Sequence, residues 1–123
     1  MDEAGYEEVT EPRAEEECDL SHRDLVKVPA DLAESCGSRR RLNLSHNCLQ
    51  RIERLESLSS LSELDVSNNQ LRRLCGLSSV RSSLTRLDVS SNQLQSPSGC
   101  NDLSKLRWLS LARNCIQVSI NFR

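Results

Sequence analysis

The feature that most constrains this chain is a repeated frame of eleven residues. In its clearest copy, residues 61–71, apolar residues occupy positions one, four, six and eleven, and asparagine occupies position nine. The frame returns in residues 84–94 and 106–116, and in residues 39–49 with arginine at position one. A fixed period of this length predicts a solenoid whose units pack only on their neighbours. The ninth-position asparagines, spaced by 22, 23 and 22 residues, are Asn47, Asn69, Asn92 and Asn114.

The repeats extend over most of the chain. Residues 18–25 align with residues 42–49, with Arg23 in place of the asparagine, as expected of a degenerate terminal unit. After Ile116, residues 117–123 alternate apolar and polar side chains in a strand-like pattern, and no capping element follows. We therefore expect a tail, residues 1–17, and a repeat domain, residues 18–123, of about five units, the first degenerate and the last truncated.

Each unit divides into an inner and an outer part. Positions four to six alternate apolar and polar residues, which predicts a short strand stacked in parallel on the preceding one at about 4.8 Å. Beyond position eleven, apolar residues recur every third position, as at Ile52, Leu55 and Leu58, a spacing typical of 3₁₀ turns. In the first unit, residues 28–37 resemble a short helix, with Pro29 at its first position and Gly37 as its left-handed stop.

The asparagines predict a structural ladder. Each lies where the chain leaves a strand, and its amide carries both donors and an acceptor, so it can bond the backbone of two successive turns. Asn47, Asn69, Asn92 and Asn114 are therefore expected to hold the coil together. Loss of one such buried partner should lower the free energy of unfolding by about 1–3 kcal/mol.

The motif Leu-x-x-Leu-x-Leu-x-x-Asn-x-Leu resembles that of the leucine-rich repeat family. The resemblance implies an α/β repeat fold: a right-handed solenoid with short parallel strands on the concave face, and 3₁₀ or short helical turns and loops on the convex face. It also implies protein binding through the concave face. The 22-residue spacing resembles the short class typified by a regulatory subunit of protein phosphatase 1, which is common in intracellular, nuclear and ciliary or centrosomal proteins.

Charge is unevenly distributed along the chain. Residues 1–17 carry eight acidic side chains and one arginine, a net charge of −7, whereas residues 18–123 carry +5. The tail lacks apolar periodicity, which predicts a disordered, solvated segment. The alternative is a tail that folds back over the basic body. The Arg39–Arg41 cluster has no interleaved aromatic residues, which does not favour nucleic acid as a partner.

The cysteines and the N-terminal sequence bear on the compartment. The first residues contain no basic region followed by an apolar run, and no apolar stretch reaches membrane length. For a chain that begins at Met1, the six cysteines are then expected to be free thiols in a reducing compartment. The expected location is the cytoplasm, with the nucleus, cilium or centrosome as further possibilities, and no membrane association is expected.

The sequence contains no constellation that predicts catalysis. No glycine-rich phosphate loop is present, so no cofactor is expected. His46 and Cys48 lie two residues apart, but two ligands do not make a zinc site, so no metal is expected either. Cys48 and Cys115 share one repeat slot and are interpreted as loop residues. We therefore expect a protein that is not an enzyme.

The outward-facing strand positions are the candidate binding surface. Position three gives alternating charges and then an indole, and position five is mostly acidic. Either neighbouring strands are linked by exposed ion pairs worth about 0–1 kcal/mol each, or the strip binds a protein with Trp108 as its anchor. The candidate protein-binding residues are Arg41, Asn43, Glu63, Asp65, Arg86, Asp88 and Trp108. Five such strands form a flat area of only a few hundred Å², below the roughly 800 Å² per partner of a standard interface.

These patterns predict a non-enzymatic, intracellular protein–protein interaction module, a scaffold or adaptor that binds through its concave face. One alternative is a regulatory scaffold of a phosphatase or of a ciliary or centrosomal assembly. Another is a fragment of an extracellular leucine-rich-repeat receptor. The expected partner is a protein of unknown identity, and no pattern predicts an oligomeric state.

Overall fold

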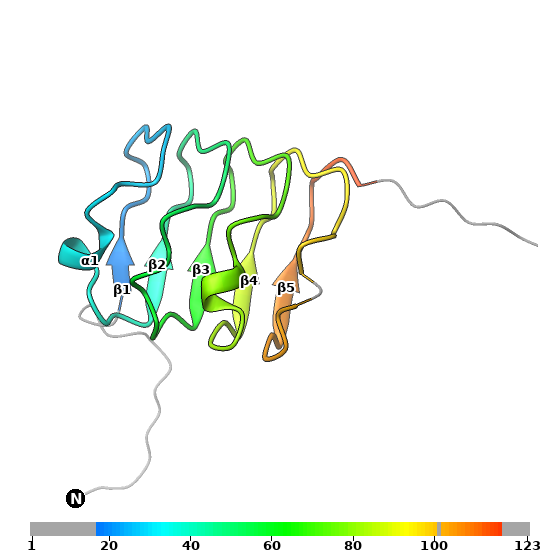
Figure 1. Ribbon diagram of the computed structural model, residues 1–123. Coiled ribbons are helices and arrows are strands. Elements are labelled where there is room, and N and C mark those ends of the chain that lie inside the picture. Colours follow the sequence, from blue (N-terminus) through cyan, green and yellow to red (C-terminus); the bar gives the residue numbers. More distant parts are fainter. Residues whose placement is uncertain (1–16, 101, 117–123) are drawn as a thin grey trace, which may run out of the picture.

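Five short strands stack in chain order into one parallel sheet (Figure 1). They are β1 (Glu17–Asp19), β2 (Arg41–Asn43), β3 (Glu63–Asp65), β4 (Arg86–Asp88) and β5 (Trp108–Ser110). The computed structural model describes residues 17–100 and 102–116. Within them the predicted parallel-strand solenoid is confirmed. The expected tail, apart from Glu17 in β1, and the strand-like pattern at 117–123 lie outside the described residues.

The sheet keeps the repeat frame in strict register. Leu42 lies opposite Leu64, Leu64 opposite Leu87, and Leu87 opposite Leu109. The first three of these leucines are almost fully buried, whereas the residues on either side of each are half-buried or exposed. Because side chains alternate across a strand, one apolar residue per strand is enough to fix which face points into the coil.

The convex side contains little regular helix. The period of three produces isolated 3₁₀-type bonds, since the Leu58 N–H donates to Leu55 O and the Leu61 N–H to Leu58 O, each at 3.1 Å. A 3₁₀ helix forms in the described part only at η2 (Ser78–Val80), where the third unit carries one extra residue. The apolar residues of these segments lie in the core beneath the turns.

The helix of the first unit, α1 (Leu32–Ser35), is shorter than the sequence predicted. Gly37 has the expected left-handed backbone, with φ +56°, and its N–H donates to Leu32 O. Pro29 was wrongly placed as the first helical residue. The first turn is organised instead by the Asp31 carbonyl, which accepts bonds from the N–H groups of Glu34 and Ser35 at 3.0 Å.

Two glycines allow neighbouring units to approach closely. Gly76 and Gly99 occupy the same repeat slot 23 residues apart, and both have positive φ. A Cβ atom on Gly76 would lie 1.9 Å from Ile52 O, and one on Gly99 would lie 1.9 Å from Leu74 O. Only a residue without a side chain fits at these positions. The shared slot was readable from the sequence, but its packing role was missed.

Cys18 and Cys36 are joined by a disulfide bond, with their Cα atoms 5.4 Å apart. This corrects the expectation that all six thiols are free. The bond links β1 to the residue after α1, and both cysteines are buried in the core of the first unit. The free cysteines in the described residues are Cys48, Cys75, Cys100 and Cys115.

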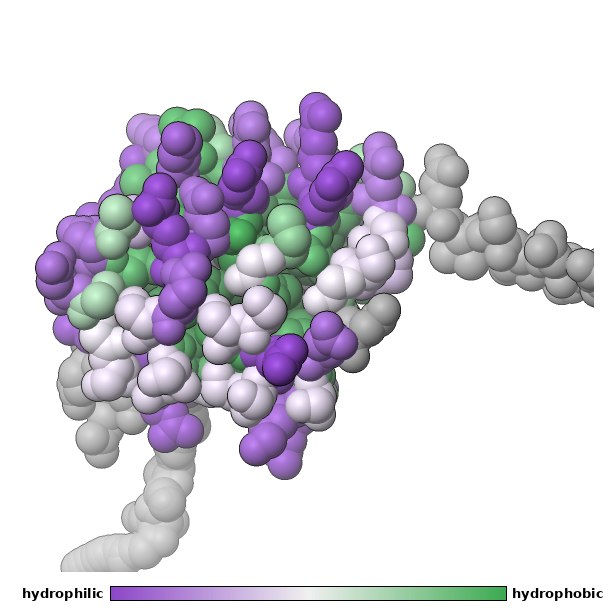
Figure 2. Space-filling view, in the orientation of Figure 1, coloured by the Kyte–Doolittle hydropathy of each residue, from purple (hydrophilic) through white to green (hydrophobic). Residues whose placement is uncertain are grey.

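Polar and apolar side chains are separated around the coil. Figure 2 shows strongly hydrophilic side chains along the edge at which the strands end, a mixture of pale and strongly hydrophilic ones along the opposite edge, and apolar atoms between them. None of the helices in the described part is long or apolar enough to cross a bilayer.

Candidate protein-binding surface

The asparagine ladder fixes the edge at which the strands end. The Asn69 side-chain amide donates to Leu44 O and Val66 O at 3.0 Å, and its Oδ1 accepts from the Leu49 N–H at 2.9 Å. One buried side chain thus bonds the backbone of two successive units, as the sequence predicted. The same pattern holds at the other three frame asparagines, Asn47, Asn92 and Asn114.

A second polar row stabilises the same turns. The Asp65 Oδ1 atom accepts from the Ser67 N–H at 2.9 Å and from the Ser67 hydroxyl at 2.6 Å. Because Ser67 is buried, its hydroxyl needs this partner. The same pair of bonds joins Asp19 to Ser21, Asn43 to Ser45, and Asp88 to Ser90.

These bonds change the interpretation of position five. Asn43, Asp65 and Asp88 were predicted to contact a partner, but each commits one side-chain oxygen to the turn that follows its strand. The signal was present in the sequence, because serine recurs at position seven of four units. In the first unit the two Ser21 hydrogen bonds, led by that from the hydroxyl, lower the pKa of Asp19.

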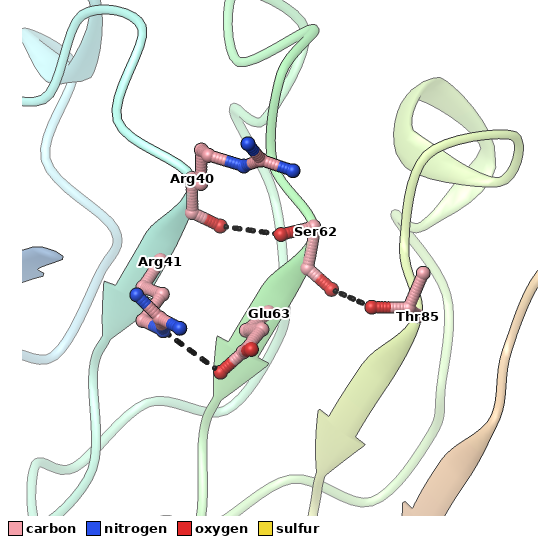
Figure 3. Close-up of polar contacts among 5 residues, drawn as sticks. All are labelled: Arg40, Arg41, Ser62, Glu63 and Thr85. Atoms are coloured by element: carbon pink, nitrogen blue, oxygen red, sulfur yellow. Dashed lines mark hydrogen bonds and ion pairs between the residues drawn. The ribbon is translucent and has the colours of Figure 1, made fainter. Parts of the chain in front are cut away.

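The third-position residues meet in register across the sheet. Arg41 Nε lies 3.1 Å from Glu63 Oε1, which is one link of the predicted ion-pair ladder (Figure 3). Of the described residues, Glu63 and Arg86 are neighbours in register but form no ion pair. Arg86 instead places its guanidinium carbon 3.7 Å from the centroid of the Trp108 ring. The predicted ladder is therefore only partly formed among these residues.

Trp108 faces outward, as its frame position predicted. It is 39% exposed, and in the described residues only Val26 is a more exposed large hydrophobic side chain. The guanidinium covers one part of the indole by a cation–π contact. Arg86 and Trp108 thus form a combined cationic and aromatic surface on the last two strands.

The outward side chains surround a shallow hollow of about 460 Å³. Its lining combines both charges with a little apolar surface, and its members are Glu17, Arg41, Leu42, Glu63, Leu64, Asp65, Arg86 and Asp88. The structure therefore brings five of the predicted binding residues together in one hollow. Asn43 lies outside this lining, and Trp108 extends the surface through its contact with Arg86.

Hydroxyl groups secure the edge at which the strands begin. The Ser62 hydroxyl donates to Arg40 O at 3.3 Å, and the Thr85 hydroxyl donates to Ser62 O at 3.1 Å (Figure 3). Each carbonyl also accepts two backbone N–H bonds from the next unit. This row restrains the backbone from which Glu63 and Arg86 extend.

The two histidines are brought together by the repeat. The rings of His22 and His46 are stacked, with centroids 4.3 Å apart and planes 10° apart. In residues 17–100 and 102–116, no three His, Cys, Asp or Glu side chains gather closely enough to hold a metal ion. Cys100 is half-buried, which raises the pKa of its thiol.

Comparison with known proteins agrees with this architecture. A family model described as leucine rich repeat matches residues 17–71, and a second leucine rich repeat model matches residues 81–99. A search of curated proteins found no match. The two matched segments contain strands β1 to β4 and three of the four frame asparagines.

Proposed function

We propose that this chain, which two leucine rich repeat models match over residues 17–71 and 81–99, is a scaffold or adaptor that binds a protein partner through its concave face. Leucine-rich repeat domains generally mediate protein–protein interaction. The observation that carries this proposal is the exposed Trp108 ring with the Arg86 guanidinium 3.7 Å from its centroid. Tryptophan and arginine are the residue types most enriched among interface hot spots. We place this function in the cytoplasm.

The hollow beside this pair supports the same proposal. Its mixture of Arg41, Glu63, Asp65 and Asp88 offers charges of both signs to a folded partner. The sheet alone is smaller than a standard interface, so loops at its edges must contribute for tight binding. Arg86 and Trp108 would then occupy the centre or the edge of a larger contact.

The proposal is tested by affinity capture from a cytosolic extract, with the full chain as bait. Trp108→Ala removes the anchor, and Val26→Ala is the matched control, because Val26 is 63% exposed, belongs to no strand and does not line the concave hollow. A hot-spot loss of about 2 kcal/mol corresponds to roughly 30-fold weaker binding. Proteins captured by the wild type and Val26→Ala, but not by Trp108→Ala, support the proposal. Equal capture by all three baits contradicts it.

The finer alternatives are separated by the identity of the captured proteins. A phosphatase catalytic subunit among the Trp108-dependent proteins would favour the regulatory role that the repeat length suggests. Ciliary or centrosomal components would favour an assembly role. Neither alternative has support in the structure beyond the repeat itself.

The Cys18–Cys36 bond supports a second candidate, an extracellular leucine-rich repeat protein. Disulfide bonds persist mainly in oxidising compartments. Mass spectrometry after thiol alkylation, without reduction, tests this in protein isolated from its native cells. Six alkylated cysteines would exclude the extracellular candidate, whereas four, with Cys18 and Cys36 protected, would favour it.

A further inference from the structure

Two further hollows lie outside the concave face, between the loops that follow β2, β3 and β4. One, of about 270 Å³, is lined by Gln50, Arg51, Gln70, Arg72 and Gln93. The other, of about 430 Å³, shares Arg72 and adds Arg73 and Gln95, with smaller residues of the same loops. We name this surface the arginine–glutamine edge and define it by Gln50, Arg51, Gln70, Arg72, Arg73 and Gln93.

The charge of this edge is uncompensated. Arg51, Arg72 and Arg73 are exposed, and within residues 17–100 and 102–116 none of them forms an ion pair or a side-chain hydrogen bond. Neither hollow has an acidic lining residue. The concave hollow, by contrast, contains four carboxylates and two arginines. The two surfaces therefore suit partners of different charge.

The repeat sets the spacing of the edge. Gln70 and Gln93 share one frame position, and their backbone N–H groups donate to Leu49 O and Leu71 O at 2.8 Å. These bonds hold the backbone of the two glutamines at the spacing of neighbouring strands, about 4.8 Å. Their amide groups carry donors and acceptors for which the described residues provide no partner.

We propose that the arginine–glutamine edge binds an acidic peptide segment of a protein partner. Guanidinium groups recognise carboxylates by paired, charge-assisted hydrogen bonds, and glutamine amides can bond the peptide backbone. A single-stranded nucleic acid would require aromatic stacking platforms. Neither hollow has an aromatic lining residue, and Trp108 lies with Arg86 on the strand surface. The edge therefore favours a peptide rich in glutamate or aspartate over RNA.

The test is fluorescence anisotropy with the full chain and a labelled ten-residue peptide rich in glutamate. Arg51→Gln/Arg72→Gln/Arg73→Gln removes the charge of the edge. Arg40→Gln/Lys105→Gln/Arg107→Gln removes the same net charge at exposed residues that line neither hollow. Loss of the three proposed ion pairs between these arginines and the peptide carboxylates should raise Kd at least about tenfold in the first variant. The control variant should change Kd less than about twofold. Circular dichroism checks that both variants are folded.

Three outcomes would overturn the proposal. The first is an equal loss of affinity in both triple variants, which would mean that only net charge matters. The second is tighter, edge-dependent binding of a ten-nucleotide polyuridine than of the peptide. The third is tighter peptide binding after the acidic residues of positions 1–16 are changed to glutamine, which would make the chain's own tail the occupant. Unchanged peptide affinity in Trp108→Ala supports a site separate from the concave surface.

Discussion

The two ends of the described solenoid differ in how completely their cores are enclosed. At the first unit, Cys18, Leu32 and Cys36 are nearly inaccessible to solvent, although Leu20 and Leu25 are only partly buried. At the fifth unit, Leu109 and Leu111 are only partly buried, although their counterparts Leu87 and Val89 in the fourth unit are fully buried. Helix α1 and the disulfide bond lie at the first end, and β5 is the last described strand of the sheet.

The polar rows also differ between the inner units and the fifth. Asn69 and Asn92 are buried, whereas Asn114 is half-buried. The turn after β4 is held by two short bonds from Ser90 to Asp88, but after β5 a single contact of 3.5 Å joins the Ala112 N–H to Ser110. In a solenoid, each unit completes the burial of the one before it. Identical sequence positions therefore have different energetic weight along the chain.

The largest expected effect compares one slot in two units. Leu87→Ala should lower the free energy of unfolding by about 4 kcal/mol, and Leu109→Ala by no more than about 2 kcal/mol, because partly exposed Leu109 leaves a smaller cavity. Urea denaturation of the two variants measures both values. Equal losses would show that the fifth unit is as well enclosed as the fourth.

Gly76→Ala tests the packing between these ends. The methyl group of an alanine there would collide with Ile52 O, and the alanine backbone would have to adopt φ +85°. We therefore expect the free energy of unfolding to fall by about 3–4 kcal/mol. Gly37→Ala is the matched control. It also has positive φ, but its nearest contact would be at 3.9 Å, so the loss should be about 1 kcal/mol. The same denaturation assay would contradict the close approach if the two variants lost equal stability.

Cys18→Ser/Cys36→Ser removes the covalent closure of the first unit. The bond spans 18 positions of sequence, so its loss should lower the free energy of unfolding by about 3 kcal/mol. The measurement is thermal unfolding with and without reductant. Reductant should lower the Tm of the wild type and leave that of the double variant unchanged. A reductant-dependent Tm in the double variant would assign the effect to other cysteines.

The smallest expected effect concerns acid stability at the first strand. The pKa of Asp19 is lowered below 3.8 in the folded chain, chiefly by the Ser21 hydroxyl. Its contribution is therefore present above pH 3.8 and is lost as the pH falls through the folded pKa. Because Asp19 is exposed, the change should be below about 0.5 kcal/mol. Asp19→Asn and Ser21→Ala should each flatten stability against pH below 4. An unchanged slope in both would remove Ser21 as the cause.

The sequence predicted the backbone of this molecule better than its side-chain contacts. Period and alternation determined the strands, their register and the inward leucines, because each depends on repeat position alone. The asparagine ladder followed from the chemistry of one side chain at one slot. The outward orientation of Trp108 followed from its frame position in the same way.

Contacts between different slots were harder to predict. The Cys18–Cys36 bond joins a strand to the residue after a helix, and no repeat relation connects the two. The ion-pair ladder stopped at Glu63 because Arg86 contacts an aromatic ring on its other side instead. The Asp-x-Ser bonds were visible as a recurring serine, but their meaning depends on the local turn that buries it.

The uneven repeat length has a consequence for how such a chain can vary. The third unit contains one residue more than its neighbours, yet in the register of the sheet Glu63 still lies opposite Arg86, and Arg86 opposite Trp108. The extra length is absorbed at η2, where the Ser83 and Leu84 N–H groups both bond Val80 O. Insertions on the convex side can therefore be accommodated without shifting the order of side chains on the sheet. The outer loops of this protein are accordingly the places where a tag, a label or a new loop can be introduced while the inner surface is kept.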